Sequence, residues 1–271
     1  QQQALASRLL PQAILALLGA LLLLPAAAGA ETALTSSTLE IGPELHRLQY
    51  REAGLMKENG VLYGGFIRLT IGIHSNLIGS LSGSLTAGEA RYDGQTMAGL
   101  PLQQDTPQWL MDLRATLGYQ WRCLLPFSGL GLRYWNDNLA AHSPYGYKRQ
   151  TAYLFSPLGL EISKTCQSGW QVGVRWELDW LWLGLNRNTD FPLDDQVTLD
   201  FYQHSGYGTQ ASLFLKYSRP GQLGFMLEPF WQYWNIQASE RQRLRTATGI
   251  SELYEPANTS TLFGLRGGLR W

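Results

Sequence analysis

The stretch WQVGVRWELDWLW, residues 170–182, decides the fold, because apolar and polar residues alternate along it. Every even-numbered residue is Trp, Val or Leu, whereas Arg175, Glu177 and Asp179 lie at odd positions. Side chains alternate across a β-strand, so one face of this segment is apolar along its whole length and the other is charged. Residues 109–121 repeat the pattern, with apolar residues at every odd position and Asp112 and Arg114 between them.

The length of these runs favours strands that cross a membrane. A tilted strand needs about 9–11 residues to cross roughly 30 Å of hydrocarbon, whereas strands of soluble proteins average about five or six. Aromatic residues gather toward the ends of the apolar faces, as in an interfacial girdle (Trp109, Tyr119, Trp121, Tyr134, Trp231 and Tyr233). The predicted fold class is therefore all-β, a transmembrane antiparallel up-and-down β-barrel. A water-soluble two-layer β-protein is the alternative.

Nine segments alternate in this way and are predicted strands: residues 60–73, 77–91, 108–121, 126–137, 149–163, 169–184, 207–218, 222–236 and 258–271. Short turns alternate with longer polar loops at 92–107, 138–148, 185–206 and 237–257. Barrels of this class have short periplasmic turns, long outer loops and an even strand number. Residues 45–56 supply a tenth strand, followed by a turn at 57–60, where Asn59-Gly60 favours a hairpin. We expect about ten strands, with eight as the alternative, and both termini in the periplasm.

The N-terminal segment resembles an export signal. An apolar run from Leu9 to Leu24 follows Arg8, and the small residues Ala28-Gly29-Ala30 come after it. This order predicts a cleaved signal peptide over residues 1–30, with a single membrane anchor as the alternative. Residues 31–44 are then a periplasmic tail, and residues 45–271 form the barrel in the outer membrane.

The inward face of the predicted strands carries both signs of charge. We expect an ion-pair network in the lumen, formed by Arg68, Asp112, Arg114, Arg133, Glu161, Arg175, Glu177, Asp179, Lys216, Glu228, Arg266 and Arg270. Ten strands enclose little free space, and a selective channel favours a ring of one sign. A self-neutralising filled lumen is therefore favoured over a conducting pore, which stays the alternative.

The last strand carries a second export feature. Phe263, Leu265, Leu269 and Trp271 share one face, with an aromatic residue at the final position. This resembles the terminal motif that the barrel-assembly machinery recognises, with Trp in place of the usual Phe. The expected partners are that machinery, outer-membrane lipid and lipopolysaccharide. Nucleic acid is not expected, because 21 basic residues balance 21 acidic ones. Oligomeric state is not predicted.

The two cysteines lie in neighbouring short turns of the predicted barrel. Cys123 and Cys166 face the oxidising periplasm in this arrangement. A disulfide between them and two separate thiols are both open.

Few residues suggest chemistry. The four histidines are scattered, none has metal-binding spacing, and no metal or cofactor is predicted. Asp200 and His204 lie with other acids in the 185–206 loop, where a carboxylate near a histidine can activate water. A solvated acidic loop is the simpler interpretation of these residues.

The layout from Arg47 to Trp271 resembles two groups of proteins. Tyr50–Gly60, Gly118-Tyr119 and Tyr145–Arg149 are similar to segments of uncharacterised bacterial porin-family barrel proteins, which implies an outer-membrane barrel without an assigned activity. Ten strands with this loop pattern also resemble the omptin proteases, which hold a water between an Asp pair and an Asp-His pair in the outer loops. Asp93 and Asp105 are not a close pair, and Asp200 and His204 have the wrong spacing. Only the architecture therefore carries over.

The leading hypothesis is a non-enzymatic outer-membrane barrel of a Gram-negative envelope, with a structural, surface-interaction or minor solute-passage role. The alternatives are an omptin-like or lipid-modifying hydrolase acting from the outer loops, for which Asp200 and His204 are the candidate catalytic residues, and a small-solute porin.

Overall fold

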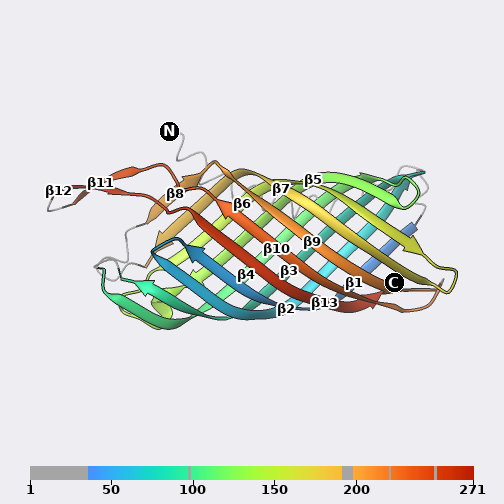
Figure 1. The fold of residues 1–271 in the computed structure, drawn as a ribbon, viewed down its shortest axis with the longest axis horizontal. Helices are drawn as coiled ribbons and strands as arrows, with labels where there is room; N and C mark the ends of the chain where they lie inside the picture. The colour runs from blue at the N-terminus through green and yellow to red at the C-terminus, as the bar shows by residue number, and fades with distance from the viewer. Residues whose placement is uncertain (1–35, 97–98, 191–197, 220, 247–248) are drawn as a thin grey trace.

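Ten long strands close into an antiparallel barrel in the computed structural model, which describes residues 36–271 apart from 97–98, 191–197, 220 and 247–248. The barrel strands are β1 (Ser36–Glu52), β2 (Met56–His74), β3 (Leu77–Gln95), β4 (Pro101–Tyr119), β5 (Leu124–Asn138), β6 (Lys148–Thr165), β7 (Trp170–Thr189), β9 (Gly206–Tyr217), β10 (Gly224–Ile236) and β13 (Asn258–Arg270). Each pairs with its neighbours in chain order, and β13 returns to β1. Figure 1 shows the strands inclined to the long axis of the barrel. The predicted fold class and strand number are confirmed.

Three short strands add to one end of the barrel. β8 (Leu199–Gln203) continues β9 along β7 with an unchanged register, and β11 (Gln242–Thr246) and β12 (Gly249–Leu253) form a separate hairpin. This hairpin projects beyond the end of the barrel opposite the C-terminus (Figure 1). We call that end the loop end and the opposite one the terminus end. The described residues also include a single 3-10 turn, η1 (Leu139–Ala141), and no helix able to cross a membrane.

The first hairpin differs from the prediction at both of its ends. β1 begins at Ser36, within the segment predicted as a tail, and continues to Glu52. The turn is at residues 53–55, where Gly54 has φ +75°, and not at Asn59-Gly60. Gly60 instead lies inside β2, where a Cβ would come 2.4 Å from the Glu89 carbonyl oxygen. Gly60 therefore allows the backbones of β2 and β3 to approach closely. The residues around Asn59-Gly60 pair with β1 and β3, and this pairing outweighs the preference of Asn-Gly for a turn.

Strands extend into three of the four predicted long loops, whereas residues 139–147 remain a loop with the η1 turn. β3 and β4 pair as far as Gln95 and Pro101, which leaves only residues 96–100 between them. The β7 strand likewise reaches Thr189. Alternation fades within residues 92–107 and predicts a loop there, but polar side chains pair across these strands: Lys57 and Gln103 both contact Asp93.

The outer surface of the barrel is an apolar belt. Tyr63, Leu158 and Trp180 are each more than 60% exposed, and aromatic pairs lie toward both ends, with ring centroids 4.9 Å apart for Trp109 and Tyr134 and 5.0 Å apart for Trp170 and Tyr217. A contiguous apolar surface of this kind is far larger than soluble monomers expose. The apolar rows face outward and the charged rows inward, which is the reverse of a water-soluble two-layer core.

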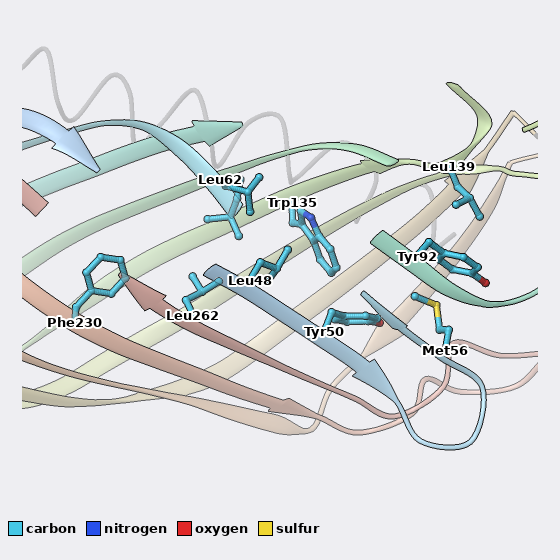
Figure 2. Close-up of a cluster of buried hydrophobic side chains, with 10 residues drawn as sticks. Leu48, Tyr50, Met56, Leu62, Tyr92, Trp135, Leu139, Phe230 and Leu262 are labelled. Carbon is cyan, nitrogen blue, oxygen red and sulfur yellow. The ribbon is translucent and has the colours of Figure 1, made fainter. Parts of the chain in front are cut away.

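Aromatic side chains fill the inner face where glycine leaves room on the next strand. The Phe155 ring lies over Gly131, and the Phe214 ring lies over Gly173, so that a Cβ on either glycine would come within 2.3 Å of the ring. In the loop half of the lumen a cluster of buried apolar side chains includes Tyr50 and Trp135, which Figure 2 shows inside the barrel. Ring packing and ion pairs together therefore fill the interior.

The apolar belt predicts that a charged residue destabilises the barrel more on the outward face of a strand than in a loop. Leu158→Arg places a guanidinium on the outward face of β6, close to the middle of the strand. We expect it to lower the free energy of unfolding in lipid vesicles by about 2–4 kcal/mol, the cost of an arginine near the midplane. Leu100→Arg, in the β3–β4 loop, is the matched control and should cost less than about 1 kcal/mol. Urea unfolding followed by tryptophan fluorescence measures both, and equal costs would contradict the belt.

Candidate functional site

Charged side chains from opposite walls meet inside the barrel. All twelve residues expected in the lumen are buried or half-buried, and eleven of them form ion pairs. The twelfth, Arg133, donates to the Gln232 side-chain oxygen at 2.7 Å. Many of these contacts join strands that are not neighbours in the sheet, such as β4 with β7, so they cross the lumen. The interior divides into three networks along the barrel.

The terminus-end network centres on three carboxylates. Arg68 donates to Glu40 at 3.1 Å and to Glu228 at 2.8 Å. Arg266 donates to Glu228 at 3.0 Å and to Glu44 at 2.7 Å. Lys216, Arg270 and His46 complete the set through Glu40 and Glu44. Each carboxylate is thus shared between basic groups, which offsets the cost of removing it from water.

The middle network forms around Arg114. Its guanidinium donates to Glu177 at 2.9 Å and to Asp179 at 3.2 Å, both on the opposite wall, and it also contacts Asp112. Arg175 joins the network through Glu177 at 3.4 Å. The cavity left beside these side chains has a volume of about 30 Å³, which leaves room for about two or three waters. The lumen is filled at this level.

The loop-end network forms around Arg149, which is almost completely buried. Its guanidinium donates to Glu52 and to Glu58 at 2.7 Å each and to Asp137 at 3.0 Å. The same group lies over the Tyr50 ring, 4.7 Å from the centroid. One cation therefore contacts three acidic side chains, so acidic groups outnumber basic ones in this network.

The sequence prediction missed seven of these residues: Glu40, Glu44, His46, Glu52, Glu58, Asp137 and Arg149. Five of them precede residue 60, where the sequence pattern predicts a tail, a weakly patterned first strand and a turn. The other two lie at strand ends, where no inward face was assigned. The alternation of Glu40, Glu44 and His46 at even positions is the signal that would have extended the first strand.

A cavity of about 540 Å³ lies beyond the loop-end network. Glu52 and Glu255 are on its wall, and Glu255, in the segment before β13, is almost completely buried. Burial, with the nearby Glu52 carboxylate, raises the pKa of Glu255 to about 8, although Arg149 acts in the opposite direction. Asn186 Nδ2 donates to Glu255 Oε1 at 2.8 Å.

Asp200 and His204 do not come together. Asp200 lies in β8 and not in a loop, and Arg187 donates to its two carboxylate oxygens at 2.7 and 2.8 Å. His204 is exposed and lies four residues further along an extended chain, which corresponds to about 13 Å. Asp194 and Asp195, in the same predicted loop, lie outside the described residues.

The two cysteines lie in neighbouring turns but remain free, exposed thiols. Ser163 N donates to the Cys123 carbonyl oxygen at 2.9 Å, so Cys123 is level with Ser163 and not with Cys166. A three-residue offset corresponds to about 10 Å along a strand, whereas a disulfide needs Cα atoms within about 7 Å. The structure therefore does not form the disulfide that the sequence left open.

The proposed assembly signal lies on the outside of the barrel. Phe263, Leu265 and Leu269 are exposed on β13, as is Trp271 directly after it. Trp271 pairs through its backbone N–H and C=O with Leu39, at the terminus end of β1. These side chains are accessible, and recognition by the assembly machinery stays a prediction.

Comparisons with known proteins show a likeness of fold. No family model and no curated protein sequence matches this chain. The outer membrane protease OmpT of Escherichia coli is similar with a TM-score of 0.51 and 9% identity, over 87% of this chain and 95% of that one. The Ail protein of Yersinia pestis has a TM-score of 0.36 with 8% identity, over 88% and 100% of the two chains. The Neisserial surface protein NspA has a TM-score of 0.35 with 8% identity, over 87% and 97%.

The likeness to OmpT shows the barrel fold alone. Its identity is too low to transfer a site, and the Asp200 and His204 side chains are held apart, as described above. The other two similarities are too distant to carry an argument. The function must therefore be argued from this chain's own residues.

Arg149 is expected to be the most sensitive charged residue of the interior. Arg149→Met removes the only cation that contacts Glu52, Glu58 and Asp137 among the described residues, and should destabilise the barrel by about 3–5 kcal/mol. Adding Glu58→Gln should recover part of that loss. Arg91→Ala, which breaks an exposed pair with Asp105, is the control and should cost less than about 1 kcal/mol. Urea unfolding in nonionic micelles measures all three, and equal losses for Arg149 and Arg91 would contradict the network.

The raised pKa of Glu255 predicts a pH dependence of stability. The folded protein holds the Glu255 proton more tightly than the unfolded chain does. The protein therefore loses stability as the pH rises from the ordinary pKa of 4.5 to the folded pKa of about 8. Thermal unfolding should therefore show this loss in the wild type and not in Glu255→Gln. Glu240→Gln, an exposed acid nearby, should behave like the wild type. Identical pH profiles for all three proteins would show that Glu255 is not shifted.

Proposed function

We propose that this protein is an outer-membrane barrel with a closed lumen, which acts through its structure and its exposed loop end and not through passage of solutes. The observation that carries the proposal is the middle network, where Arg114 joins Asp112, Glu177 and Asp179 across the lumen beside a cavity of only about 30 Å³. Even a small sugar is far larger than this space. The minor solute passage allowed by the sequence is therefore not part of the proposal.

The placement in the outer membrane rests on three features. The apolar belt requires hydrocarbon around the barrel. Residues 1–30, which lie outside the described part of the chain, have the pattern of a cleaved signal peptide. The exposed aromatic face of the last strand resembles an assembly signal. With an even number of strands, the first and the last barrel strand have their free ends on one side, at the terminus end, which we assign to the periplasm, and the loop end faces outward.

A hydrolase of the omptin type is the second candidate. It required Asp200 and His204 to act on one water, and both oxygens of Asp200 are instead bound by Arg187. The Asp200 carboxylate on which this activity depends is therefore occupied in a structural ion pair. We do not propose this activity.

The closed lumen predicts that the protein does not conduct ions in planar lipid bilayers. Purified wild-type protein should give no conductance steps, because the middle network fills the lumen. A variant with Asp112, Arg114, Glu177 and Asp179 all replaced by Ser removes the four side chains together and leaves Arg175 paired with Glu161; it should show steps. Heat-dependent electrophoretic migration checks that both proteins are folded. Stepwise conductance by the wild type would overturn the proposal.

A further inference from the structure

The cavity at the loop end has the size and the walls of a binding site for a small molecule. Its volume of about 540 Å³ lies within the range of about 300–1,000 Å³ that is usual for ligand pockets. Four aromatic rings line it from four separate segments of the chain: Tyr92 in β3, Tyr147 before β6, Phe201 in β8 and Tyr254 after β12. Rings from such distant segments form an apolar wall that no single loop could supply. Aromatic faces also attract cations.

The ionisable side chains around this cavity are mainly acidic. Glu52 and Glu255 lie on its wall, and Glu58 and Asp137 lie behind it in the loop-end network. Arg149 contacts three of these four carboxylates. Glu255 has no basic group within ion-pair distance among the described residues, and the guanidinium of Arg241 lies outside the cavity, over the Tyr254 ring. When Glu255 is ionised, its carboxylate therefore has no counter-charge among the described residues.

An unpaired acceptor points in the same direction. Asn188 lines the cavity and is 6% exposed. Its Oδ1 atom has no hydrogen-bond donor among the described residues. A buried acceptor without a donor costs about 1–3 kcal/mol, and an N–H or O–H group of a ligand in the cavity would satisfy it.

We infer that this cavity binds a protonated amine with an apolar body, whose ammonium N–H groups donate to Glu255 and to Asn188 Oδ1 while its apolar part packs against the four aromatic rings. A charge-assisted bond to Glu255 supplies the missing counter-charge, and the rings exclude water from the pair. The site extends the proposed function by giving the loop end a ligand. It does not depend on whether the lumen is closed.

Binding is coupled to the protonation of Glu255. Because its pKa is raised to about 8 without a ligand, the Glu255 carboxyl must release a proton to the solvent when the ammonium ion binds at neutral pH. An aliphatic amine keeps its own proton up to a pH of about 10. The affinity should therefore increase between pH 6 and pH 8.5, and this increase should be absent in Glu255→Gln.

The test is calorimetric titration of the full protein in maltoside micelles with three probes, with heats from empty micelles subtracted. Phenethylamine carries the ammonium group, 2-phenylethanol is its neutral analogue, and N,N,N-trimethylphenethylammonium carries the charge without N–H donors. We expect phenethylamine to bind at pH 8.5 at least about tenfold more tightly than either analogue, which corresponds to about 1.4 kcal/mol. Glu255→Gln should remove this difference, whereas Glu240→Gln should keep it.

The inference is overturned if 2-phenylethanol binds as tightly as phenethylamine, if no probe gives saturable heat, or if Glu240→Gln weakens binding as much as Glu255→Gln. Equal binding of the trimethyl probe would overturn the role of the N–H donors. None of these results bears on conductance, so the failure of this inference and the failure of the closed-lumen proposal are distinguishable.

Discussion

Hydrocarbon around a β-sheet leaves its backbone N–H and C=O groups with no partner except another strand. That constraint closes the sheet, and every barrel strand here pairs with two neighbours, including β13 with β1. Closure with ten strands then brings side chains from opposite walls into contact. The charged residues that alternate with the lipid-facing ones have no access to lipid and little to water, so they must neutralise one another inside.

The three networks meet this demand in different ways. At the terminus end carboxylates are shared between basic groups, as when Glu228 binds both Arg68 and Arg266. In the middle Arg114 binds three carboxylates, and Arg175 adds a second cation at Glu177. At the loop end a single arginine serves three carboxylates, and Glu255 has no described cation. A filled, neutralised interior favours rigidity and closure. The wall of the loop-end cavity instead carries Glu255 without a cation and Asn188 Oδ1 without a donor, and these groups favour a ligand. The pairing of acidic and basic side chains thus accounts for both the closed lumen and the binding cavity.

Alternation in the sequence was sufficient to predict the barrel, its strand number and most of its inward charges, because period two persists wherever lipid touches one face. It was insufficient where that contact stops. Asp137 and Arg149 lie at strand ends that project beyond the belt, and Glu58 sits beside an Asn-Gly pair that local preference assigned to a turn. Tertiary pairing with β1 and β3 decided that segment. The cavity could not be predicted, because Tyr92, Tyr147, Phe201 and Tyr254 are brought together only by closure.

The central claim is that lipid contacts alternate residues while their neighbours are sealed in the lumen, and residues 210–215 of β9 test it most directly. Each residue in turn would be replaced by Cys, in a chain with Cys123 and Cys166 changed to Ser, and labelled with a nitroxide in lipid vesicles. The account predicts high accessibility to oxygen, and not to a water-soluble nickel chelate, at positions 211, 213 and 215, with both reagents excluded at 210 and 212. Access of the nickel chelate to 211, 213 and 215, or accessibility without a period of two, would contradict it.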